Sequence, residues 1–467
     1  MNVIWIIFLL AMGACVGSFL NVVIYRLPRG QSIVFPGSHC PSCGRPIRWF
    51  DNIPLFSWLL LGGRCRRCKV PISPRYFVVE AATALRVAGL FVCYYLLRLR
   101  AGAGDFPDTW PMFLAHAGLL CGLLACAIID IEHYIVPLEV MWVCTGVGLA
   151  AAAFRPHPFL ATVSAPTIGV AAAAAVGLVA AILLARWGVI PRSFIDAEES
   201  PPPQSKKPAG RHGDPPAATG KGHSPAANEG RAAKPPASKN RPASGRSSAA
   251  GGAKESPPPF PGGLRTLAAI VFGTLSGAAL AYVPRPKEAP EDGQNVAMSA
   301  EHGVQPRREV LWEALFLLPP LGLAAGVALL FHLAPSVAAA WAHLFDAKAS
   351  PLIAPHLTGL GSALFGYLIG GLWIWATRIL GTLAFNKEAM GMGDVHILAA
   401  VGAVTGWIVP SLTFFAAPVI GLGWALYLWI GRRQGVLPYG PYLATGALVV
   451  LIFYDAIVQQ LQLAMGL

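Results

Sequence analysis

Long apolar segments separated by short polar ones recur along most of this chain. An α-helix of about 20 apolar residues spans the hydrocarbon core of a bilayer. Segments of this kind fall near 3–25, 76–97, 111–129, 136–154, 166–190, 311–333, 355–385, 396–410, 411–431 and 440–465, and a weaker one lies near 265–283. The pattern predicts an all-α polytopic membrane protein with about ten transmembrane helices.

The composition supports this prediction. Of the 467 residues, 55% are hydrophobic and 12% are charged, whereas soluble domains carry about 25% charged residues. The first apolar segment has no basic residue ahead of it and is longer than the apolar part of a typical signal peptide. We therefore expect it to remain as a membrane helix.

The net charge of +12 does not indicate a nucleic-acid partner. The basic residues gather in two polar stretches, 26–75 and 200–262, rather than along a helix with interleaved aromatic residues. Basic loops tend to lie in the cytoplasm, and Asp51 is the single acidic residue of 26–75. We expect that loop to be cytoplasmic, with the lipid bilayer and no nucleic acid as a partner.

Residues 197–262 are rich in Pro, Ala, Gly, Ser and Lys and have almost no aliphatic bulk, a composition typical of disorder. If 26–75 is cytoplasmic and the segments 166–190 and 265–283 both cross the membrane, the helix 311–333 has to begin on the side away from the cytoplasm. Arg307 and Arg308 indicate that the next helix begins in the cytoplasm, so either 166–190 or 265–283 does not cross fully. The basic linker favours 166–190 as the span, but the sequence leaves the choice open.

Four cysteines form two Cys-x2-Cys pairs in the basic loop: Cys40, Cys43, Cys65 and Cys68. This spacing is typical of tetrahedral zinc held by four thiolates, an arrangement that leaves no open position and is therefore structural. The alternatives are a pair of disulfides or a redox motif. A reducing cytoplasm disfavours disulfides, and no strand–helix redox pattern surrounds the pairs. The sequence predicts a structural zinc site.

Two carboxylates stand at the ends of apolar segments. Asp130 ends the third segment, and Asp394 follows Gly391 and Gly393 at the start of another. Ionisable groups at membrane depth are expensive and therefore functional candidates, and two carboxylates held together can share one proton and act as acid and base. The glycines would let a neighbouring backbone approach closely. Asp is also a preferred helix cap, so the spacing alone leaves a structural role open for each.

Several motifs occur in one order: GSFLNVVIYRLP (17–28), DNIPLFSW (51–58), ISPRYFVVE (72–80), IIDIEHYIVP (128–137), GMGDVHILAAVGAVTGW (391–407) and PYGPYLATGAL (438–448). Together they resemble the type IV prepilin peptidases, over roughly 1–154 and 355–460. The resemblance implies an aspartyl endopeptidase of the bacterial inner membrane, of the Gly-x-Gly-Asp type. It implies that Asp130 and Asp394 are catalytic, face the cytoplasm, and remove the short basic leader of prepilins or pseudopilins after a glycine.

The resemblance also implies that the new N-terminus is methylated by means of S-adenosylmethionine and the cysteine loop, with cofactor-binding residues unknown. Two features depart from the family. Leu138 stands after Val136-Pro137, where many relatives have an acidic residue, which leaves Asp130 the sole candidate there. Residues 155–354 have no counterpart in the resemblance, which implies no role for them.

These observations predict five regions: a first transmembrane helix (1–25), a four-cysteine loop expected to serve methylation (26–75), a membrane core with the first Asp (76–154), an insertion with extra apolar helices (155–354), and a peptidase core (355–467). Three alternatives remain. One is a presenilin-like intramembrane protease, against which the cysteine loop speaks. The others are a membrane methyltransferase with a silent peptidase site, and a non-enzymatic transporter or scaffold with a zinc docking loop.

Overall fold

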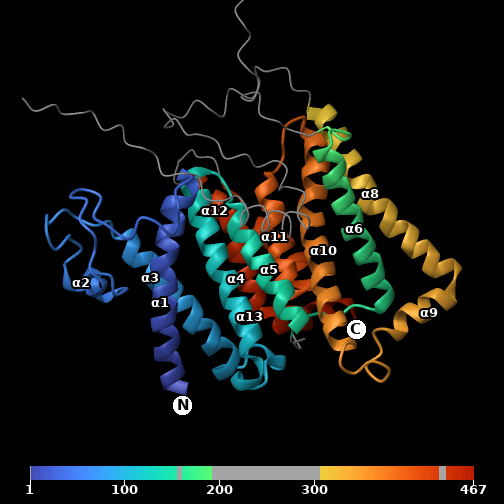
Figure 1. The fold of residues 1–467 in the computed structure, drawn as a ribbon, viewed down its shortest axis with the longest axis horizontal. Helices are drawn as coiled ribbons and strands as arrows, with labels where there is room; N and C mark the ends of the chain where they lie inside the picture. The colour runs from blue at the N-terminus through green and yellow to red at the C-terminus, as the bar shows by residue number, and fades with distance from the viewer. Residues whose placement is uncertain (1, 155–159, 192–305, 431–437, 467) are drawn as a thin grey trace, which may run out of the picture. The chain divides into compact units, whose positions relative to one another are not determined.

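The computed structural model describes residues 2–154, 160–191, 306–430 and 438–466 (Figure 1). The chain divides into two units, one of residues 1–195 with 265–467 and one of 196–264. All described residues belong to the first unit. The predicted disordered linker 197–262 and the weak apolar segment 265–283 lie outside the described residues.

The described residues form helices and no strand longer than an isolated bridge. The α-helices are α1 (Asn2–Arg26), α2 (Phe56–Leu60), α3 (Arg75–Phe91), α4 (Phe106–His133), α5 (Leu138–Phe154), α6 (Ala165–Arg186), α8 (Pro306–Leu333), α9 (Pro335–His343), α10 (Ala354–Phe385), α11 (Met392–Thr405), α12 (Ile408–Ile430) and α13 (Gly440–Met465). Within these ranges, 7 helices are long and apolar enough to cross a membrane, and three more are apolar but shorter. The prediction of an all-α membrane protein with about ten such helices is confirmed.

Small residues line the contacts between neighbouring helices. This is common in membranes, where the hydrophobic effect does not drive helices together and small residues allow close backbone packing instead. A Cβ atom added at Gly13 of α1 would lie 2.8 Å from the Cα atom of Ala84, and one at Gly17 would lie 2.7 Å from the Cα atom of Glu80. Because residues later in α1 meet residues earlier in α3, the two helices are antiparallel. The basic loop between them therefore leaves and re-enters the bundle at one end.

Helices α10 and α11 pack most intimately. Gly366 lies against Gly402, and Gly370 lies against Leu398, so α11 runs back along α10 (Figure 1). The left-handed backbone of Gly406, with φ +78°, then ends α11. The start of α11, which carries Asp394, therefore lies beside the end of α10.

Helix α5 connects the two aspartate-bearing segments. It follows α4 after a short link, and its residue Gly148 lies against Ala403 of α11, while Val136 in the link lies against Gly393. Because the residue just before α5 lies against the start of α11, and a residue late in α5 lies against one late in α11, the two helices run parallel. The end of α4 and the start of α11 consequently lie at the same end of the bundle, which brings Asp130 toward Asp394.

Helices α6 and α8, from the segment without a counterpart in the resemblance, form an antiparallel pair beside α10 (Figure 1). Gly169 near the start of α6 lies against Phe331 near the end of α8, and Gly177 lies against Pro319 and Pro320 at mid-length. The end of α6 and the start of α8 therefore lie at the same end of the pair. The structure extends α6 over 22 residues, a length that suffices for a span.

Candidate active site

Asp130 is held in place from across the bundle. Its Oδ2 atom accepts a hydrogen bond of 3.0 Å from the backbone N–H of Gly440, at the first residue of α13. A Cβ atom at Gly440 would lie 2.6 Å from the same oxygen and 3.4 Å from Cδ1 of Ile397, one turn after Asp394. The start of α13 can therefore approach only because this residue is glycine, and Asp130 faces the first turns of α11.

Asp394 lies in the first turn of α11, where Gly391 occupies the N-cap position. Asp394 is thus not the cap of its helix, which was one reading of the sequence. Its side chain and that of Asp130 are both buried, at 8% and 7% exposure, and both lie at the end of the bundle where Val136 lies against Gly393. The structure therefore brings together the two carboxylates that the sequence singled out.

The two glycines of the Gly-x-Gly-Asp motif differ in their surroundings. A Cβ atom at Gly393 would lie 2.5 Å from Cβ of Val136, whereas the nearest neighbour of one at Gly391 would be Oδ2 of Asp394, at 3.9 Å. We expected the glycines to make room for a substrate backbone. The close neighbour of Gly393 is instead Val136 of the same chain, six residues after Asp130, so this contact joins the two aspartate-bearing segments.

The four cysteines converge as predicted. Their sulfur atoms all lie within 4.8 Å of one another, and Sγ of Cys40 lies 3.7 Å from Sγ of Cys68. Four ligands at a Zn–S distance of about 2.3 Å in a tetrahedron would be about 3.8 Å apart. The sulfur positions therefore fit a metal ion of this coordination, and the cluster could hold one.

The two cysteine pairs have the same backbone structure. The N–H of Cys40 donates to the carbonyl of Arg45 and that of Cys65 to the carbonyl of Val70, both at 2.9 Å. Hydrogen bonds from the backbone N–H groups of Cys68 and Arg67 lower the pKa of Cys65 to about 6, whereas burial and the neighbouring thiols raise the pKa of Cys68 to about 11. A lowered pKa favours the thiolate, which is the form that binds a metal ion.

Three polar contacts fasten the cysteine loop. The guanidinium of Arg66 binds Asp51, with its NH2 atom at 2.7 Å from Oδ1, and this contact lowers the pKa of Asp51. Oε2 of Glu80, buried on α3, accepts the N–H of Leu55 at 2.8 Å. At the exit of the loop, Arg75 pairs with Glu132 of α4 at 2.9 Å, which links the loop to the end of α4 that carries Asp130.

A matched pair of substitutions tests the backbone of the two cysteine pairs. The residue after the second cysteine is left-handed in each, Gly44 with φ +67° and Lys69 with φ +58°. Gly44→Ala is expected to destabilise the loop by about 1 kcal/mol, and Lys69→Gly to leave it as stable or more so. Amide hydrogen exchange across residues 40–70 measures both, and equal destabilisation by the two substitutions would contradict this account.

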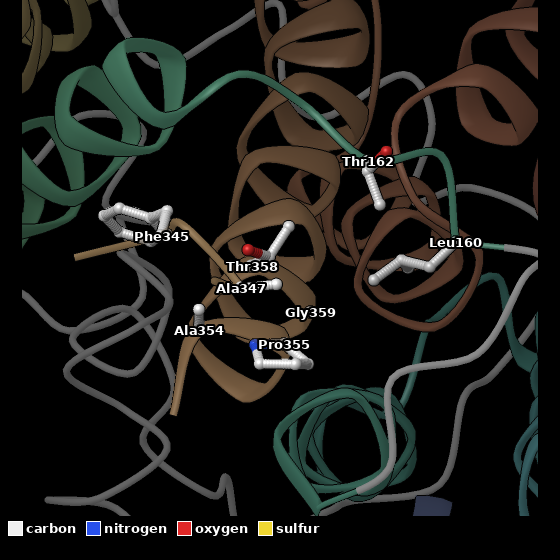
Figure 2. A pocket seen from close by; sticks show the side chains of 8 residues that line it. All are labelled: Leu160, Thr162, Phe345, Ala347, Ala354, Pro355, Thr358 and Gly359. Atoms are coloured by element: carbon white, nitrogen blue, oxygen red, sulfur yellow. The ribbon is translucent and has the colours of Figure 1, made fainter. Parts of the chain in front are cut away.

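A cavity of about 270 Å³ lies at the start of α10, the opposite end of that helix from the carboxylates. Figure 2 shows the residues that line it: Leu160, Thr162, Phe345, Ala347, Ala354, Pro355, Thr358 and Gly359. None of these side chains is ionisable. This cavity therefore offers no side chain that could act as an acid or a base.

These features define a class: a helical membrane protein with a buried carboxylate pair at one end and a four-cysteine loop fastened to the same helices. Residues 11–94 match the family model of the Bacterial Peptidase A24 N-terminal domain. No solved structure matches the chain.

The chain is similar to curated proteins named Prepilin leader peptidase/N-methyltransferase. That of Myxococcus xanthus is 48% identical over 147 residues, which cover 31% of this chain and 40% of the relative. Those of Pseudomonas aeruginosa and Klebsiella pneumoniae are 37% and 41% identical, over 28% and 30% of this chain and 50% and 60% of the relatives. The chain thus spans about half the length of these relatives. The resemblance to prepilin peptidases that the motifs predicted is confirmed for these parts of the chain.

Sequence reasoning missed two residues of the site. Gly440 lies within the motif 438–448, but the motif predicts no role for it. Its position between Tyr439 and Pro441 at the start of an apolar segment is a signal in the sequence that could have indicated one. Arg378 lies inside a long apolar segment, where a charge is itself a signal. It binds the loop before Asp394 through Glu388 and the carbonyl of Met390, and no sequence pattern indicates that contact.

Proposed function

We propose that the chain is an aspartyl endopeptidase of the bacterial inner membrane, which removes the basic leader of type IV prepilins or pseudopilins after a glycine. One observation carries the proposal. Asp130 and Asp394, 264 positions apart in the sequence, lie buried at the same end of the bundle, where Gly440 lies close to both Asp130 and Ile397 of α11. The names of the relatives support the same substrate class.

In the proposed mechanism one ionised aspartate takes a proton from the water that attacks the glycine carbonyl. The protonated partner donates a hydrogen bond to that carbonyl, and a proton then passes to the leaving amine. The N–H of Gly440 donates a hydrogen bond to Oδ2 of Asp130. The other oxygen, Oδ1, would therefore face the substrate. Burial excludes bulk water from the carboxylates, which strengthens their interaction with the substrate carbonyl.

The proposed orientation places this end of the bundle in the cytoplasm. Arg75 at the end of the basic loop pairs with Glu132 at the end of α4, so the loop and the carboxylates share one end. Basic loops favour the cytoplasmic side. Glu132 and Glu388, partly exposed there, are paired with arginines of this chain, and a basic leader would compete for the same carboxylates.

We propose zinc as the metal of the four cysteines, where it would supply a cross-link that orders the loop. Four thiolates leave no open position for a substrate. The purified protein is expected to hold about one zinc ion per chain, which Cys65→Ser loses and Asp394→Asn keeps. Elemental analysis by mass spectrometry measures this, and a wild type without zinc, or Cys65→Ser with it, would refute the assignment.

Methylation of the new N-terminal amine is the second proposed activity, supported by the N-methyltransferase part of the relatives' names. S-adenosylmethionine would supply the methyl group. We assign no residue to its binding. A membrane methyltransferase with a silent peptidase site is not favoured, because the relatives are named leader peptidases as well as N-methyltransferases.

Co-expression tests both activities. The chain is produced with a type IV prepilin in cells that lack their own prepilin peptidase, and the prepilin is recovered and weighed. Loss of the leader supports the peptidase, and an added methyl mass on the shortened protein supports the methyltransferase. A prepilin that keeps its leader, while a known prepilin peptidase removes it in the same cells, rejects the peptidase for that substrate.

A further inference from the structure

Helix α8 brings a buried acid to the core of the bundle, although it belongs to the segment that has no counterpart in the resemblance. Glu313 of α8 is 2% exposed, and so is Arg378 of α10. Oε1 of Glu313 accepts a hydrogen bond of 2.8 Å from Nε of Arg378. Burying a charge costs several kcal/mol per ion unless it is well paired. Glu313 and Arg378 therefore depend on each other, and their contact joins α8 to α10.

The other side of the same guanidinium contacts the loop that leads into α11. The Nη1 atom of Arg378 lies 2.7 Å from Oε1 of Glu388 and donates a hydrogen bond to the carbonyl of Met390. Arg378 therefore joins α8, through its Nε atom, to the segment directly before Gly391.

The end of α10 holds the rest of this loop. Oγ1 of Thr382 accepts the N–H of Ala389 at 3.3 Å, and a Cβ atom at Gly381 would lie 2.6 Å from Cβ of Ala389. The residues in contact with the loop, at positions 378, 381 and 382, lie on one face of the helix. The loop thus rests on that face with Arg378 as its charged contact.

We propose that Glu313 is a positioning residue: through Arg378 it fixes the loop 386–391 and thereby the orientation of Asp394 toward Asp130. The inference rests on the proposed peptidase function. A guanidinium is planar and rigid, so a carboxylate bound at Nε also fixes the direction of Nη1.

The test compares two substitutions at the same carboxylate. Glu313→Ala removes the partner of Arg378. Trp375→Phe removes the indole N–H that binds the other oxygen, Oε2, at 3.2 Å, and reduces the ring that lies against Phe316 of α8. Glu313→Gln keeps a hydrogen-bond acceptor for Nε and serves where Glu313→Ala does not fold.

Two readouts are taken, one of which does not depend on cleavage. Amide hydrogen exchange across residues 386–392 is expected to be faster in Glu313→Ala than in the wild type and unchanged in Trp375→Phe. With a prepilin substrate, kcat of Glu313→Ala is expected to fall roughly tenfold to a hundredfold at little change in KM. Glu313→Gln should lie between Glu313→Ala and the wild type in both readouts.

The outcomes separate this inference from the proposed function. A wild type that does not cleave rejects the peptidase, and hydrogen exchange then decides the role of Glu313 alone. Unchanged exchange in Glu313→Ala and Glu313→Gln overturns the inference, as does faster exchange with unchanged kcat in an active enzyme. Equal effects of Glu313→Ala and Trp375→Phe also overturn it, because they would show a general loss of packing between α8 and α10.

Discussion

Asp394→Asn and Asp130→Asn are each expected to reduce the rate of leader cleavage roughly a thousandfold. Proton transfer by a positioned acid or base contributes about 10²–10⁴-fold to a rate, and an amide neither takes up nor delivers the proton. Asparagine has the shape of aspartate, and its carbonyl oxygen can still accept the N–H of Gly440. The loss should therefore be one of chemistry and not of folding. Single-turnover cleavage of a prepilin by the purified protein in liposomes measures it.

A control for this prediction comes from the same helix as Asp130. Asp108 is exposed in the first turn of α4, at the other end from the carboxylate pair. Asp108→Asn changes the charge of the chain by the same amount and is expected to leave the cleavage rate within about twofold, since exposed substitutions act weakly. A rate above one tenth of wild type for either Asp130→Asn or Asp394→Asn would contradict the assignment, as would an equal loss in Asp108→Asn.

The second large effect is expected at Gly393. Gly393→Ala places a methyl group 2.5 Å from Cβ of Val136, so the link after α4 or the start of α11 has to move. A displacement of about 1 Å in a catalytic group can cost 10²-fold in rate, and we expect a loss of roughly that size. In Gly391→Ala, a substitution in the same motif, the nearest neighbour of the new methyl group is Oδ2 of Asp394 at 3.9 Å, and the backbone has an ordinary φ of −71°. Its effect should be within a few fold.

A second substitution should relieve the clash. Val136→Gly removes the Cβ atom that the new methyl group meets at 2.5 Å, together with both Cγ atoms, so the double variant Gly393→Ala/Val136→Gly is expected to recover most of the lost activity. Neighbouring residues that share one contact are non-additive in this way. Cleavage rates and thermal unfolding of the four proteins form the cycle. Additive losses would show that Gly393 acts by something other than its contact with Val136.

The helices and the chemically reactive residues of this chain could be predicted because each leaves a local signal. Runs of apolar residues marked the spans, and paired spacing marked the cysteines. The expected start of one helix at 396 was late, because α11 begins at Met392 and includes Asp394 in its first turn. A boundary drawn at the first apolar residue omits a carboxylate that the helix has buried.

The contacts between helices could not be predicted. Nothing local in the sequence tells that Gly440 faces Asp130, or that Gly393 meets Val136, because apolar helices have no polar face to orient them. The same holds for Glu313 and Arg378. Each is a lone charge in a different apolar segment, and only the packing of α8 on α10 makes them partners.

The central claim is that Asp130 and Asp394 act as one unit, and the double variant tests it most directly. Single-turnover cleavage is measured for wild type, Asp130→Asn, Asp394→Asn and Asp130→Asn/Asp394→Asn, with long incubations to reach slow rates. Groups that act as a unit give non-additive losses, so the double variant is predicted to cleave as slowly as the slower single variant and no slower. A double variant that falls by the product of the two single losses, or a single variant with wild-type rate, would contradict the claim.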